Sequence, residues 1–185
     1  ILPVVIGVGA NQINSIVDKS LASLLGTEVV ASFSYAIKLY EFVQALFITS
    51  ILAVIYPRLS SMIVSDRMDS FLNSLKKTMN VIIVALVPII VGCIVLSRQI
   101  VEVLFQRNAF TSKDTTMTAS ILWIYVIGIL AFALRDVLTR GFYSMEDSKT
   151  PMINSIISIV FNISLNLILV KPLGYKGLAI ATAVS

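Results

Sequence analysis

The stretch VIIVALVPIIVGCIVLS, from Val81 to Ser97, runs for seventeen residues without a charged side chain. An α-helix rises about 1.5 Å per residue, so roughly 20 apolar residues cross the ~30 Å hydrocarbon core of a bilayer. A second uncharged run extends from Thr116 to Leu134. These two runs indicate helices that cross a membrane, and the rest of the chain is interpreted around them.

The composition of the chain supports the membrane interpretation. It is 57% hydrophobic and 13% charged, whereas a soluble domain is about 45–50% apolar and about 25% charged. The net charge of +4 comes from Lys and Arg residues that lie mostly between the apolar runs. Such residues face anionic lipid, so no nucleic-acid partner is implied. The chain has one cysteine, Cys93, and no histidine, so a disulfide framework, a thiolate metal site and a histidine base are all excluded. We do not expect an enzyme.

The apolar runs divide the chain into five complete spans and the start of a sixth, which predicts an all-α, polytopic transmembrane helix bundle. The complete spans are expected at about 2–25, 30–56, 78–97, 115–138 and 151–170, and the sixth begins near Tyr175. The sequence starts with Ile1 rather than Met and stops at Ser185 inside an apolar segment. We therefore interpret it as an internal piece of a longer protein.

The segments between the spans predict an orientation. Lys and Arg are slightly more numerous on the side that holds the second-to-third and fourth-to-fifth connections, which favours that side as cytoplasmic. In the first connection, Met62, Phe71 and Leu72 mix with Asp66 and Arg67, a pattern typical of an amphipathic segment along the membrane surface.

The second connection carries a cluster of charges. It includes Arg135, Asp136 and Arg140, and we interpret it as a solvated loop that pairs its own charges. The alternative is that its basic residues guide a phosphate-bearing head group.

The second predicted span contains two ionisable residues, Lys38 and Glu41. They are three residues apart and therefore neighbours on one helix face, with Ser34 and Tyr35 on or beside it. A charge at the bilayer centre costs about 2.5–3.5 kcal/mol or more, so the pair needs an explanation. Either it is an internal ion pair near the interface, with Lys38 reaching towards water, or it forms the charged wall of a water-filled cavity that meets an anionic substrate.

Polar stripes mark the first and fifth spans. The first stripe consists of Asn11, Asn14 and Asp18, and the second of Ser155, Ser158, Asn162 and Asn166. Ser and Asn commonly form hydrogen bonds between membrane helices, and this is the favoured interpretation. The alternative is that the Asp18 carboxylate, with amide and hydroxyl oxygens of neighbouring helices, holds a small hard cation such as Na⁺.

Three segments of the chain resemble the MurJ/MviN family of bacterial lipid II flippases. From Gln12 to Ser60 the resemblance rests on QINSIVDKSLASLL, SYAIKLYEF and YPRLS. It continues in ALRDVLTRGFYSMEDSKTP from Ala133 and in KPLGYKGLAIATA from Lys171. These motifs follow one another in the family's order and at similar spacing over essentially the whole chain.

The resemblance implies a fold within the multidrug/oligosaccharidyl-lipid/polysaccharide exporter superfamily. In that fold two six-helix lobes face a central cavity. Residues 1–185 would form the second, C-terminal lobe, truncated at both ends. The implied topology makes the same two connections cytoplasmic as the count of Lys and Arg does.

The resemblance also implies a function and partners. The protein would move lipid II, an undecaprenyl-diphosphate-linked peptidoglycan precursor, across the bacterial cytoplasmic membrane by alternating access. It would act in cell-wall synthesis and cell shape, beside membrane lipids and the first lobe of the same chain. The alternatives are a flippase for another polyprenyl-linked saccharide, a cation-coupled exporter of the superfamily, and a non-transporting scaffold in cell-wall assembly.

The residues expected to bind substrate follow from the same resemblance. The family places a basic residue and a nearby acid on its eighth span, facing the cavity, and these fall on Lys38 and Glu41, with Tyr35 beside them. The family commonly has arginine at the first position. Lysine keeps the charge but loses bidentate recognition of phosphate.

Some family members hold Na⁺ among their seventh, eleventh and twelfth spans. The corresponding positions here are Asp18, Asn162, Asn166, Thr182 and the carbonyl of Leu178. A carboxylate seen at the Asn166 position is an amide in this chain, which lowers the negative charge of the site.

Overall fold

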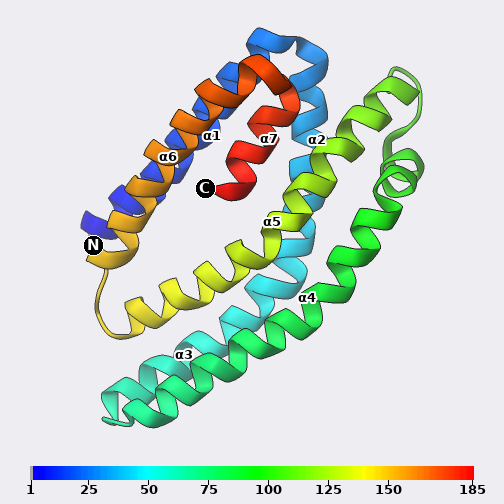
Figure 1. Cartoon of the computed structure of the whole chain (residues 1–185). Helices are drawn as coiled ribbons and strands as arrows, with labels where there is room; N and C mark the ends of the chain where they lie inside the picture. The colour runs from blue at the N-terminus through cyan, green and yellow to red at the C-terminus, as the bar shows by residue number, and fades with distance from the viewer. Residues whose placement is uncertain (1) are drawn as a thin grey trace.

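The chain folds into a bundle of long α-helices (Figure 1). The computed structural model describes residues 2–185; in the first helix it describes the side chains of Gln12 and of the residues from Asn14 onward. No strand occurs in residues 2–185, and the all-α prediction is confirmed. The elements are α1 Leu2–Leu25, α2 Thr27–Val43, the π-helical segment η1 Gln44–Thr49, α3 Ser50–Val64, α4 Met68–Phe105, α5 Ser112–Ser144, α6 Lys149–Leu173 and α7 Tyr175–Val184.

The predicted transmembrane bundle is confirmed, with spans longer than expected. By length and composition, the stretches able to cross a membrane in residues 2–185 are Thr27–Val64, Met68–Phe105, Ser112–Ser144 and Lys149–Leu173. The first of these combines α2, η1 and α3 into one rod. The helix α1 has its predicted bounds but is not among the four.

The amphipathic segment expected along the membrane surface is not a separate element. The helix α3 continues to Val64, and α4 begins at Met68 after a short turn. Phe71 is only 1% exposed, because it and Leu75 pack against Gly141 of α5. Phe71 is therefore buried against a neighbouring helix, while Leu72 of the same turns of α4 remains 44% exposed.

The solvated loop expected around Arg135 begins later than predicted, because α5 continues without interruption to Ser144, whereas the expected pairing of charges within the cluster is found between Arg135 and Asp136. Arg135 and Asp136 are half-buried helical residues. The turn comes only at Met145–Ser148, where Glu146 takes a positive φ. A stretch that looked like a connection is therefore the last part of α5.

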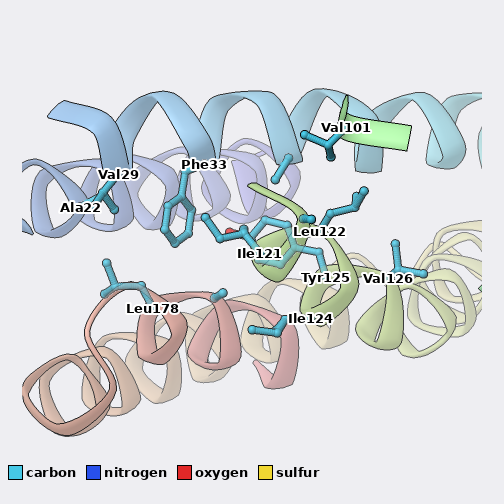
Figure 2. Packing of buried hydrophobic residues seen from close by; sticks show 13 residues of the cluster. Ala22, Val29, Phe33, Val101, Ile121, Leu122, Ile124, Tyr125, Val126 and Leu178 are labelled. Atoms are coloured by element: carbon cyan, nitrogen blue, oxygen red, sulfur yellow. The ribbon is translucent and has the colours of Figure 1, made fainter. Parts of the chain in front are cut away.

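The helix α5 occupies the centre of the bundle (Figure 1). Its most apolar window is 56% buried within the chain, against 11% for each of the other three spans. The antiparallel pair α3–α4 packs on one side, while α1, α6 and α7 gather on the other. Figure 2 shows Phe33 of α2, Tyr125 of α5 and Leu178 of α7 meeting in the core. The ring centroids of Phe33 and Tyr125 are 6.2 Å apart in an edge-to-face arrangement.

The break expected between the fifth span and the sixth, which begins near Tyr175, is confirmed: α6 ends at Leu173, and Gly174 has a φ of +57° that favours glycine. The chain then reverses into α7, which lies between the α1–α6 pair and α5 (Figure 1). Gly177 makes this close return possible, since a Cβ there would collide with the backbone carbonyl of Leu169. The reversal brings Thr182 to Asp18 of α1.

Candidate functional site

The Asp18 carboxylate is the centre of a polar cluster where α1, α6 and α7 meet. The Asn166 amide donates from Nδ2 to Oδ1 of Asp18 at 2.6 Å. The Thr182 hydroxyl donates to the other carboxylate oxygen, Oδ2, at 2.9 Å. Residues from three helices that are far apart in the sequence thus meet at one acid. The hydrogen bonds to its carboxylate offset part of the free-energy cost of placing a charge within the membrane.

The cluster extends along α6 and α7. Nδ2 of Asn166 also donates to Oδ1 of Asn162 at 2.7 Å, and the Thr182 hydroxyl lies 3.0 Å from the carbonyl oxygen of Leu178. Asn162 in turn donates to the Ser185 hydroxyl at 3.1 Å. The structure therefore brings together every residue predicted to hold Na⁺: Asp18, Asn162, Asn166, Leu178 and Thr182.

Asn166 controls what this cluster can bind. It is fully buried, its Nδ2 faces two acceptor oxygens, and its Oδ1 has no hydrogen-bond partner. Carboxylate, amide, hydroxyl and carbonyl oxygens are the donors that a hard cation prefers, so the donor set fits Na⁺. In this arrangement, however, the Asn166 N–H groups lie between the oxygens of Asp18 and Asn162.

The polar stripes divide in the structure. Asn162 and Asn166 join the cluster, whereas the Ser155 hydroxyl donates to the Pro151 carbonyl of its own helix. Asn14 is half-buried, and its Oδ1 is buried without a partner. The side chain of Asn11 lies outside the described residues.

A cavity of about 250 Å³ opens beside the cluster, between α1, α2, α5 and α7. Asp18 and Thr182 line it, and so do Glu41, Gln44 and Arg135. The aromatic rings of Tyr40, Tyr125 and Phe132 form part of its wall. One cavity therefore joins the candidate cation site to the ionisable residues of α2 and α5.

Lys38 and Tyr35 lie on a different part of α2 from this cavity. The ammonium of Lys38 is exposed and stands 5.5 Å from the centroid of the Tyr35 ring. The Tyr35 ring packs against Phe105 and Phe110, with centroids 4.7 and 5.1 Å apart. The structure therefore separates Glu41, which lines the cavity, from the other two predicted substrate-binding residues.

The ion-pair interpretation of Lys38 and Glu41 is wrong. In residues 2–185 the ion pairs are Lys113–Glu28, at 2.8 Å, and Arg135–Asp136, at 3.9 Å. The i,i+3 neighbours Lys38 and Glu41 point to different surroundings, because Lys38 leans onto Tyr35. Of the two residues, only Glu41 lines the cavity, so the charged-wall interpretation fits Glu41 and not Lys38.

Arg135 also belongs to the site, although the sequence pattern places it in a connection and favours a solvated loop over a role in guiding a head group. Its guanidinium lies over the Phe132 ring at 4.8 Å, and the side chain lines the cavity with Glu41. Its pairing with Asp136 is long, at 3.9 Å, so much of its donor capacity remains for a ligand. The available signal was its place directly after the uncharged run Thr116–Leu134, which indicates a helical rather than a loop position.

A half-buried carboxylate in a polar cluster, next to a charge-lined cavity between long apolar helices, is typical of the class of membrane transporters. Residues 1–185 match the family described as "Lipid II flippase MurJ". The chain belongs to this family.

Named relatives and solved structures agree with this assignment. The "Probable lipid II flippase MurJ" of Vibrio cholerae is 37% identical over 100% of this chain and 35% of its own length. That of Helicobacter pylori strain 26695 is 31% identical over 100% of this chain and 40% of its length. The chain therefore spans between about a third and two fifths of such relatives.

Among solved structures, a lipid II flippase MurJ in an inward closed conformation has a TM-score of 0.86 and 29% identity. The match covers 99% of this chain and 38% of that structure. An outward-facing multidrug resistance transporter of the MATE family gives the same TM-score at 16% identity, over 99% of this chain and 40% of its own. This second likeness shows the shared fold alone.

Proposed function

We propose that this chain is the second lobe of a flippase that carries lipid II across the cytoplasmic membrane of a bacterium. Family membership over the whole chain supports the substrate, and the family consists of transporters rather than enzymes. The observation that carries the proposal is the cavity between spans in which Glu41 and Arg135 meet. A bundle that served only as a scaffold would gain nothing from the insertion cost of such charges.

The charges of this lobe suit a diphosphate head group. Lys38 is exposed on another part of α2, outside the cavity, and Arg135 lines the cavity. Phosphate oxygens accept charge-assisted hydrogen bonds from both kinds of cation, bidentate ones from arginine. Glu41 then limits how long the anion stays, because it opposes negative charge in the same cavity. The first lobe of the same chain supplies the facing wall, and the prenyl tail remains in lipid.

Transport follows from alternating access, in which the two lobes rock around the bound head group. This lobe offers a rigid support for that motion, because α5 packs against both of its halves. The π-helical segment η1 interrupts the long span Thr27–Val64 beside the cavity, where Gln44 contributes to the lining. Such segments often occur at functional sites.

Na⁺ is proposed as a coupling ion for the polar cluster. Asp18, Asn162, Thr182, the Leu178 carbonyl and Asn166 through Oδ1 would hold it. When bound, Na⁺ supplies a positive charge that offsets the Asp18 carboxylate. The unpartnered Oδ1 of Asn166 supports this role, whereas its inward-facing amide nitrogen competes with it.

Complementation tests the flippase role. Cells depleted of their own lipid II flippase would receive the full-length protein or its Lys38→Ala variant, with equal expression verified. We expect rescue by the parent and loss of rescue by the variant, while Lys38→Arg keeps activity. Rescue by both would remove Lys38 from the site. Rescue by neither parent nor variant would favour another polyprenyl-linked saccharide, which competition in a flipping assay would then identify.

A further inference from the structure

A second cavity of about 250 Å³ lies between α3 and α4, and it shares no lining residue with the first. Arg58 of α3 and Lys77 of α4 both line it. Its apolar wall includes Ile51, Ile55 and Val81. The cavity therefore combines basic groups with a hydrocarbon surface, between two helices that run side by side in Figure 1.

The two cations lie at the same depth in the membrane. The uncharged run Phe42–Pro57 ends directly before Arg58, and the uncharged run Thr78–Ser97 begins directly after Lys77. Because α3 and α4 are antiparallel and joined by a short turn, both boundaries fall on one membrane surface. Basic residues at such boundaries are at the level of lipid head groups.

Neither cation has an acidic partner in the part of the chain that the structure describes, where the ion pairs are Lys113–Glu28 and Arg135–Asp136. Both side chains are exposed. Two uncompensated positive charges at the rim of one cavity attract an anion, and the membrane surface offers anionic phospholipids at high local concentration.

We propose that this cavity binds an anionic phospholipid, with its phosphate diester between Arg58 and Lys77. One acyl chain would then descend along Ile51, Ile55 and Val81. A zwitterionic lipid carries its own ammonium beside the phosphate, which the two cations repel, so the site selects for net negative charge. This site is independent of the cavity assigned to the transported head group.

Native mass spectrometry of the delipidated full-length protein tests the proposal. Phosphatidylglycerol and phosphatidylcholine with identical acyl chains would be titrated against the parent and against the double variant Arg58→Gln/Lys77→Gln. A basic residue near an anionic membrane surface contributes about 1 kcal/mol, which is roughly fivefold in affinity. We therefore expect the double variant to lose roughly 25-fold in affinity for the first phosphatidylglycerol, with phosphatidylcholine binding unchanged.

The matched control is Arg67→Gln/Lys76→Gln, which removes two nearby exposed charges that do not line the cavity. This control should retain the affinity of the parent. If both double variants lose the same affinity for phosphatidylglycerol, the effect comes from the net charge of the protein, and the proposal is overturned. Unchanged binding in Arg58→Gln/Lys77→Gln would do the same. If lipid II competes with phosphatidylglycerol for the parent, and Arg58→Gln/Lys77→Gln weakens the binding of lipid II as well, the cavity belongs to the transported substrate instead.

Discussion

Asn166 links Asp18 to Asn162 in the polar cluster through two hydrogen bonds. Its Nδ2 lies 2.6 Å from Asp18 and 2.7 Å from Asn162, where it satisfies both acceptors without a cation. A carboxylate at the same position would have no such donor and would repel Asp18. We therefore expect the residue at position 166 to set how strongly the proposed site depends on Na⁺.

We predict that Asn166→Asp makes the full-length protein more strongly stabilised by Na⁺. Ligand binding to the folded state contributes about 1.4 kcal/mol when Na⁺ exceeds its Kd tenfold. Thermal unfolding in NaCl and in choline chloride at equal ionic strength measures the difference. Asn14→Asp adds the same charge to the first cavity but outside the donor set, so it should show no Na⁺-specific gain. Identical responses of the parent and Asn166→Asp would contradict the assignment.

Arg135 makes the second prediction at the residue scale. A hydrogen bond to a charged group contributes about 1.5–3 kcal/mol, so Arg135→Ala should slow flipping by roughly 10- to 100-fold. Arg135→Lys keeps the positive charge but loses the two parallel hydrogen bonds that a guanidinium donates, so it should retain part of the flipping rate. Reconstituted flipping of fluorescent lipid II measures both variants. Arg98→Ala, at an exposed position of α4 outside the cavity, should flip at the parental rate; equal activity of Arg135→Ala would remove Arg135 from the site.

At the scale of elements, close helix contacts depend on glycine. A Cβ at Gly128 of α5 would lie 2.7 Å from the carbonyl oxygen of Ala183 in α7. Overpacking of this kind costs about 1–3 kcal/mol, so Gly128→Ala should lower the melting temperature of the full-length protein. Gly92→Ala in α4 is the matched control, because nothing lies within 4 Å of its Cβ position. If both variants melt alike, α5 and α7 do not pack as closely as the structure indicates.

The start of α6 depends on a charged cap. Asp147 accepts hydrogen bonds from the Thr150 hydroxyl and from the amides of Thr150 and Lys149. The Thr150 hydroxyl, with these amides, lowers the pKa of the Asp147 carboxyl below its ordinary value. A lowered pKa gives stability that is full above about pH 4 and is lost as the pH falls through the folded pKa.

Asp147→Asn should therefore be less stable than the parent from neutral pH down to about pH 4. The difference between the two melting temperatures should shrink at lower pH, where the parental carboxyl is itself protonated. Thermal unfolding over that range checks this. A difference that stays constant with pH would show that the cap does not act through its charge.

The existence of the helices could be predicted from the sequence, whereas their ends and mutual contacts could not. Uncharged runs such as Val81–Ser97 identify spans because they reflect the bilayer itself. Phe71 was predicted to lie in a surface segment and Arg135 in a loop, but both residues belong to helices that continue beyond the uncharged runs. Contacts with neighbouring helices, which local sequence does not show, partly or fully bury them there. The contact of Asp18 with Asn166 joins residues 148 positions apart; the family resemblance implied it, and no local periodicity encodes it.

For the whole molecule, the distribution of exposed side chains is uneven. Apolar residues such as Val84, 74% exposed, and Val103, 85% exposed, suit contact with lipid. Lys38 and Glu41 are exposed as well, and a charge facing hydrocarbon costs about 2.5–3.5 kcal/mol or more. The face around α2 therefore needs protein or water against it, which a first lobe and its cavity would supply.

This leads to a prediction for the split protein. Residues 1–185 expressed alone should be degraded, while co-expression with the remainder of the full-length protein as separate chains should restore their level in membranes. Lys38→Leu/Glu41→Leu removes the exposed charges and should raise the level of the lone segment without restoring complementation. Quantitative immunoblots of membranes and rescue of flippase-depleted cells provide the two measurements. Stable accumulation of the unmodified segment alone would mean that its charged face tolerates lipid, and the two-lobed arrangement proposed here would lose its physical basis.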